Sequence, residues 1–72
     1  MWGRYAAMSR LSFIAFCIEH YSEYAGRPSN EIYAIFRKEG LLDMLRDDYD
    51  DLHGMGVEYM VQFCDDYLRG MA

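Results

Sequence analysis

The chain has 72 residues, of which 53% are apolar and 17% aromatic, and its formal net charge is −5. A chain of this length forms one domain, near the lower limit at which a single core sustains folding. We therefore expect one domain over residues 1–72, with its core within about 9–69. The apolar content excludes a disordered chain. The negative charge argues against a nucleic acid or a membrane surface as ligand, because both favour clustered lysine and arginine.

The compartment and the state of the thiols follow from a few local features. The longest apolar run, Leu11–Ile18, is far shorter than the roughly 20 residues of a transmembrane helix. The N-terminal residues lack the pattern of a signal peptide, so we expect a cytoplasmic protein. Cys17 and Cys64 lie in apolar helical patterns without CxxC spacing, which predicts two reduced, buried thiols and no zinc site. A disulfide between them would require secretion.

Apolar residues recur at helical spacing along the whole chain, and no window alternates as a strand does. The first helix is expected over about residues 8–24, with Ser9 as its cap. Its expected main buried stripe is Leu11, Ile14, Ala15, Ile18, Tyr21 and Ala25. A second stripe beside it consists of Phe13, Phe16, Cys17 and Tyr24. A helix that is apolar over most of its circumference is central to its domain or forms an oligomer interface.

The clearest break in the helical pattern is Gly26-Arg27-Pro28-Ser29, after which Ser29 is expected to cap a second helix that runs to Glu39. Gly40 ends that helix. A short third helix is expected over Leu41–Asp47, then a turn or a single helical turn over Tyr49–His53, and a last helix over about Met55–Arg69. The last helix is expected to turn Val57, Met60, Val61, Cys64 and Leu68 inward. The predicted fold is all-α, a compact orthogonal bundle of four helices with a short third helix.

Most of the net charge lies in one acidic run, Asp43–Asp51, which contains five aspartates and a single arginine. Such a run can bind Ca²⁺ or Mg²⁺, can dock a basic partner, or can be a solvated connector. As an EF-hand loop beginning at Asp47 it fails, because Tyr49 takes the third position and Leu52 the sixth, where glycine is required. We favour the connector, then the docking patch, and expect no metal or cofactor.

His53 lies close to Tyr49 and Asp50, and a carboxylate beside an imidazole is an arrangement used in general acid–base catalysis. No nucleophile motif or phosphate loop accompanies it, so we expect no enzyme, and a hydrogen bond from His53 to nearby backbone is the simpler role. A small metal-binding or enzymatic domain centred on His53 stays open as an alternative. His20 and Glu23 form an expected surface pair, since two ligands do not make a metal site.

Four basic residues lie around the second and third expected helices: Arg27, Arg37, Lys38 and Arg46. The tight connection at Gly40 resembles the spacing of a helix-turn-helix. The would-be recognition helix, however, carries Asp43, Asp47 and Asp48, which would meet phosphates with the wrong sign. We expect no nucleic-acid ligand and keep a DNA-binding regulator as an alternative.

The chain has more aromatic residues than one small core needs: Tyr5, Phe13, Phe16, Tyr24, Tyr59, Phe63 and Tyr67 lie at the edges of the main stripes. Aromatic residues complete small cores, and they are also enriched at the centres of protein interfaces. The favoured function is non-catalytic protein binding, either to a partner or to a second copy. The hypothetical partner surface consists of Asp47, Asp48, Tyr49, Asp50, Asp51, His53, Tyr59 and Phe63.

Four segments combine aromatic, aliphatic and acidic residues in a recognisable way: Phe16-Cys17-Ile18-Glu19-x-Tyr21, Ile32-Tyr33-x-x-Phe36, Gly40-Leu41-Leu42-Asp43-x-Leu45 and Tyr49-Asp50-x-Leu52-His53-x-x-Gly56-x-Glu58-Tyr59. Over about residues 11–69 the chain resembles a bacterial family called domain of unknown function 3791. The resemblance implies a small helical protein encoded beside ADP-ribosyltransferase-like proteins, and hence an antitoxin-like or accessory role. It implies no activity for particular residues.

Overall fold

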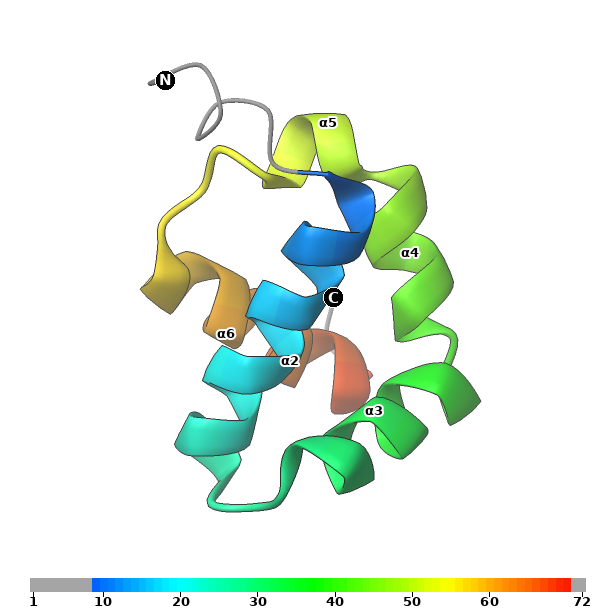
Figure 1. Cartoon of the computed structure of the whole chain (residues 1–72), viewed down its shortest axis with the longest axis vertical. Helices are drawn as coiled ribbons and strands as arrows, with labels where there is room; N and C mark the ends of the chain where they lie inside the picture. The colour runs from blue at the N-terminus through cyan, green and yellow to red at the C-terminus, as the bar shows by residue number, and fades with distance from the viewer. Residues whose placement is uncertain (1–8, 71–72) are drawn as a thin grey trace.

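Five helices form from the residues that the computed structural model describes, 9–70 (Figure 1). They are α2 (Arg10–Ala25), α3 (Ser29–Lys38), α4 (Leu41–Asp47), α5 (Tyr49–Leu52) and α6 (Val57–Leu68). No strand occurs in this part of the chain, and the predicted all-α class is confirmed. The count exceeds the expected four because Tyr49–Leu52 is a short helix of its own, and the orthogonal crossing stays a prediction. The radius of gyration, 11.9 Å, is close to the roughly 11 Å typical of a compact chain of this length.

Helix α2 packs against α3, α4 and α6, and α6 crosses behind it in Figure 1. Three of its most buried side chains follow one another at intervals of four residues: Phe13, Cys17 and Tyr21. The expected main stripe is wrong for Leu11, Ala15 and Ala25, because Leu11 is 80% exposed and both alanines are also exposed. A helix that is apolar nearly all round does not reveal its orientation in the sequence. The orientation depends on which neighbouring helices pack against it.

The ends of α2 form as the sequence predicts. The Ser9 hydroxyl accepts a hydrogen bond from the backbone N–H of Ser12 at 3.1 Å, which satisfies one of the free donors of the first turn. Gly26 follows the helix with φ of 69°, the left-handed conformation that favours glycine. The expected cap of α3 is wrong. Ser29 is the first residue of that helix, and its hydroxyl donates to Glu19 Oε1 at 3.2 Å instead, while extended Pro28 precedes it.

The corner between α3 and α4 is tightly packed. Gly40 has φ of 82°, and the neighbouring side chains Phe36 and Leu41 are both completely buried. The Tyr67 hydroxyl of α6 donates to the Glu39 carbonyl at 3.1 Å. A side chain at Gly40 would be strained by that φ and would lie 3.4 Å from the same hydroxyl. The end of α6 is thereby attached to this corner.

Helix α6 begins at Val57, two residues later than expected, and buries Met60, Cys64 and Asp65. Val57 was expected to face inward, but 39% of it is exposed. Val57 lines an open groove between α2 and α6. The inward surface of α6 is therefore made by its second and third turns.

Both cysteines lie in the core and are free thiols, with Cys17 2% and Cys64 1% exposed. A hydrogen bond with Cys17, together with burial, raises the pKa of the Cys64 thiol well above its ordinary value. A thiol that stays protonated inside an apolar core is a poor nucleophile. Cys64 therefore contributes packing between α2 and α6 rather than chemistry.

Candidate functional site

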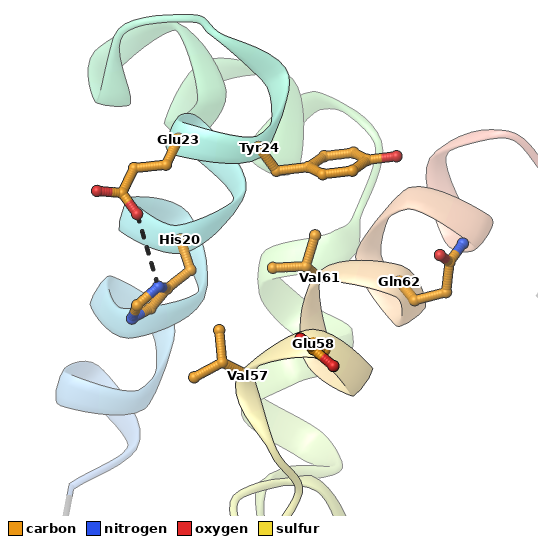
Figure 2. Close-up of a pocket in the computed structure, with 7 residues that line it drawn as sticks. All are labelled: His20, Glu23, Tyr24, Val57, Glu58, Val61 and Gln62. Atoms are coloured by element: carbon orange, nitrogen blue, oxygen red, sulfur yellow. Dashed lines mark ion pairs between the residues drawn. The ribbon is translucent and has the colours of Figure 1, made fainter.

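An open groove lies between α2 and α6 and encloses about 450 Å³. Seven residues line it: His20, Glu23 and Tyr24 from α2, and Val57, Glu58, Val61 and Gln62 from α6 (Figure 2). Its volume falls within the roughly 300–1,000 Å³ of ordinary ligand sites. The groove combines an apolar wall with a polar rim.

The apolar wall comes from helical spacing on two different elements. Val57 and Val61 are four residues apart and therefore share one face of α6, and in Figure 2 both point toward α2 while the Tyr24 ring reaches toward α6. Tyr24 is 56% and Val57 39% exposed, whereas Val61 is half-buried against the core. Large apolar side chains that are open to solvent on facing helices are typical of contact surfaces.

The polar rim of the groove is acidic. Glu23 has its side chain 84% exposed, and its nearest charged neighbour is His20, whose Nδ1 lies 3.9 Å from Glu23 Oε1. Glu58 is exposed and makes no hydrogen bond or ion pair with any residue in 9–70. No lysine or arginine is among the described residues that line the groove. Two carboxylates thus flank the apolar wall without a strong cationic partner.

A buried carboxylate, Asp65 of α6, is hydrogen-bonded to Tyr24, one of the residues that line the groove. Asp65 is 7% exposed and accepts hydrogen bonds from the Tyr21 hydroxyl at 2.9 Å and the Tyr24 hydroxyl at 3.5 Å, while Arg69 Nε lies 2.9 Å from its second oxygen. A carboxylate near the C-terminal end of a helix interacts unfavourably with the helix dipole. The donors therefore offset both this repulsion and the cost of burying the charge. The network ties α2 to α6 and orients the ring of Tyr24.

The environment of Tyr21 is the clearest electrostatic perturbation in this network. Burial of its ring, followed by the hydrogen bond and the negative charge of Asp65, raises the pKa of Tyr21 to about 12. The Tyr21 hydroxyl therefore stays protonated at neutral pH and remains a donor to Asp65. A stable donor of this kind fits a structural role.

The acidic run from Asp43 to Asp51 lies elsewhere, on α4 and α5, and much of its charge is paired within the chain. Arg46 contacts Asp43 at 2.9 Å and Asp47 at 3.7 Å. Arg10 of α2 lies 3.8 Å from Asp50. These pairs are exposed, so each contributes at most about 1 kcal/mol, but together they reduce the charge that this run offers to a partner.

The remaining members of the hypothetical partner surface lie in different environments. Tyr49 is 9% exposed, packs edge-on against Phe13 with ring centroids 5.5 Å apart, and stacks on His53 at 4.5 Å, so its ring is part of the core. The His53 Nδ1–H donates to the Tyr49 carbonyl at 2.8 Å, a backbone contact that occupies one ring nitrogen.

Tyr59 is 53% exposed, whereas Phe63 is half-buried against the core. Asp48 and Asp51 are exposed.

Sequence reasoning named His20 and Glu23 as a surface pair, placed Tyr24 in the second apolar stripe of the first helix, and assigned Val57 and Val61 to the core. The spacing of four residues on each helix was the only signal in the sequence, because the groove exists only once α2 and α6 pack together. Among residues 9–70, no three histidine, cysteine or acidic side chains are grouped closely enough to hold a metal ion. His20 and Glu23 supply only two such groups at the groove.

Comparison with known proteins identifies the family. The family described as "Protein of unknown function (DUF3791)" matches residues 12–70, so the chain belongs to it. No curated protein and no solved structure matches the chain significantly. Within the described residues, every helix is too short or too polar to cross a lipid bilayer.

Proposed function

We propose that this protein is a non-catalytic protein-binding module and that the groove between α2 and α6 is its docking surface. The observation that carries the proposal is the open apolar wall of Tyr24, Val57 and Val61, flanked by carboxylates. Exposed aromatic and aliphatic side chains supply most of the binding energy at protein interfaces. The Asp65 network holds both sides of the groove in place before binding, which lowers the entropic cost of association.

The role of such a module is to regulate or assist a partner protein. The resemblance of the sequence suggests a co-encoded ADP-ribosyltransferase-like protein as the first partner to test, with this chain acting as an antitoxin-like or accessory subunit. Self-association is the competing form of the same proposal. Light scattering over a range of protein concentrations separates the two.

Two variants of α6 test which face of the helix binds. Val57→Glu places a charge in the apolar wall, and it should not disturb folding because the residue is partly exposed and an acid is favourable in the first helical turn. Tyr59→Glu makes the same change two residues later, at an exposed position that does not line the groove. Circular dichroism confirms that both variants fold.

The experiment is affinity purification of the tagged protein from its native host, followed by mass spectrometry of the proteins that co-purify. We expect a partner that wild type and Tyr59→Glu retain and that Val57→Glu loses. A partner lost with Tyr59→Glu but kept with Val57→Glu would move docking to the other face of α6. Recovery of a clean monomer with no partner would count against the proposal.

A further inference from the structure

We infer that the groove takes a basic amphipathic segment of a partner protein, with an aliphatic side chain placed against Tyr24, Val57 and Val61 and a lysine or arginine placed between Glu23 and Glu58. This inference rests on the proposed function and adds the chemistry of the partner. It follows from charge, from the size of the groove and from the composition of its wall.

The charge of the groove favours a cation. Glu23 lies on α2 and Glu58 on α6, so carboxylates are present on both sides of the apolar wall (Figure 2). Arg69, the basic residue nearest in the supporting network, is already engaged by Asp65 at 2.9 Å. A cationic side chain from a partner would therefore find Glu58 without an ion pair to any residue in 9–70, and Glu23 paired only with His20, which is charged only when protonated.

The size and wall of the groove favour side chains over a whole element. A volume of about 450 Å³ accommodates a few side chains rather than an inserted helix. Tyr24, Val57 and Val61 offer no charged group to an inserted side chain, so an aliphatic residue is the matching anchor. A segment that carries an anchor and a nearby cation satisfies the wall and the rim together.

Charge also disfavours a second copy as the occupant. The chain has a net charge of −5, and a copy seated symmetrically on the groove would bring its own Glu23 and Glu58 to the same place. Like charges placed opposite one another weaken an interface. A basic segment from another protein avoids this repulsion.

The test is a selection of short random peptides displayed on phage, carried out in parallel on three folded proteins. They are the wild type, Glu23→Lys/Glu58→Lys, and the matched control Asp48→Lys/Asp51→Lys, which makes the same charge change on the acidic run. Circular dichroism checks the fold of each. Val57→Glu then serves as a counter-screen for peptides that bind outside the groove.

We expect wild type and the control to enrich peptides with an aliphatic residue near lysine or arginine, and the groove variant to enrich acidic peptides instead. By fluorescence anisotropy, binding of a basic peptide should weaken about tenfold or more in Glu23→Lys/Glu58→Lys, the effect of about 1.4 kcal/mol. It should change little in the control.

Other outcomes overturn the inference in distinguishable ways. Peptides that require Val57 but show no basic preference would remove the basic segment and leave the proposed function standing. A basic preference lost only in Asp48→Lys/Asp51→Lys would place the cation site on the acidic run. A dimer that Val57→Glu dissolves would make a second copy the occupant. If no peptide depended on Val57, both the inference and the groove as docking surface would fail.

Discussion

The groove and the acidic run both carry exposed carboxylates, and they use their charge differently. In the acidic run, Arg46 lies between Asp43 and Asp47, and Arg10 reaches Asp50 from another helix. In the groove, the carboxylates of Glu23 and Glu58 have no such arginine. A dense cluster of charge in a sequence therefore does not identify the surface whose charge is available.

The two regions also differ in what holds them in place. The acidic run is anchored by an apolar residue, Tyr49, which packs edge-on against Phe13. The groove is anchored by a polar residue, Asp65, which accepts hydrogen bonds from two tyrosines of α2. Apolar burial contributes steadily over a wide pH range, whereas a hydrogen-bonded carboxylate depends on its partners. The following changes test this contrast.

The largest expected effect is the loss of Tyr49. Tyr49→Ala removes a ring that is 9% exposed and leaves a cavity against Phe13, so it should lower the free energy of unfolding by about 3 kcal/mol or more. Urea denaturation followed by circular dichroism measures the change. Tyr59→Ala is the matched control, because Tyr59 is 53% exposed and its loss should cost less than about 0.5 kcal/mol. Equal costs for the two variants would contradict the core assignment of Tyr49.

The next effect concerns the support of the groove. Asp65→Ala leaves the buried Tyr21 hydroxyl without its acceptor and should lower the free energy of unfolding by about 2–3 kcal/mol. The adjacent Asp66 accepts a hydrogen bond from Gln62 at the surface, at 2.9 Å, and Asp66→Ala should cost less than about 0.5 kcal/mol. Urea denaturation of both variants provides the comparison. A similar loss in both would show that Asp65 does not join the helices.

A smaller effect appears only at alkaline pH. The pKa of Tyr21 is raised from 10.0 to about 12 in the folded protein, so the folded state binds this proton more tightly than the unfolded chain does. The stabilisation is fully present below about pH 10 and is lost as the pH rises toward 12. Tyr21→Phe should therefore be less stable than wild type at neutral pH, by about 1–2 kcal/mol, and the difference should shrink between pH 10 and 12.

Urea denaturation at a series of pH values tests the Tyr21 effect. Tyr33→Phe removes the hydroxyl of an exposed tyrosine and serves as the matched control, since Tyr33 is 47% exposed. A constant difference between wild type and Tyr21→Phe over the whole alkaline range would mean that the pKa of Tyr21 is not raised, and hence that its hydroxyl is neither buried nor bonded to Asp65 in solution.

The sequence predicts most of the fold because the relevant signals are local. The cap at Ser9 and the glycines at 26 and 40 depend on neighbouring residues only, and the structure confirms all three. The orientation of α2 was predicted less well, since Leu11 and Phe13 begin stripes of similar apolar character. Only the neighbouring helices decide which stripe is buried.

The candidate site could not be predicted from local sequence patterns, because it also depends on how the helices pack. The groove joins residues of α2 to residues of α6, which lie more than 30 positions apart in the chain. Asp65 looks like a solvent-facing acid, because carboxylates are rarely buried unless they are paired. Its spacing of four from Val61 was the one hint that it shares the inward side of the helix.

The smallest expected effect separates paired from unpaired charge within the acidic run itself. Asp48→Asn/Asp51→Asn removes two exposed carboxylates from a crowded acidic segment, and the relief of repulsion should outweigh the loss of Asp51 from the first turn of the short helix α5. The fold should therefore be slightly more stable at low salt, by less than about 0.5 kcal/mol. Asp43→Asn removes a partner of Arg46 and an acid from the first turn of α4, so it should destabilise by a similar amount.

Urea denaturation at low salt and at about 1 M salt tests the opposite signs. Both effects should decline at high salt, because the Debye length is then only about 3 Å and interactions between exposed charges are largely screened. If Asp48→Asn/Asp51→Asn instead cost more than about 1 kcal/mol, these carboxylates would be structural. The acidic run would then have no charge left to offer, and the contrast with the open carboxylates of the groove would become sharper still. If Asp43→Asn were stabilising, Arg46 would not neutralise the acidic run. The hypothesis that the acidic run docks a basic partner would then be favoured again.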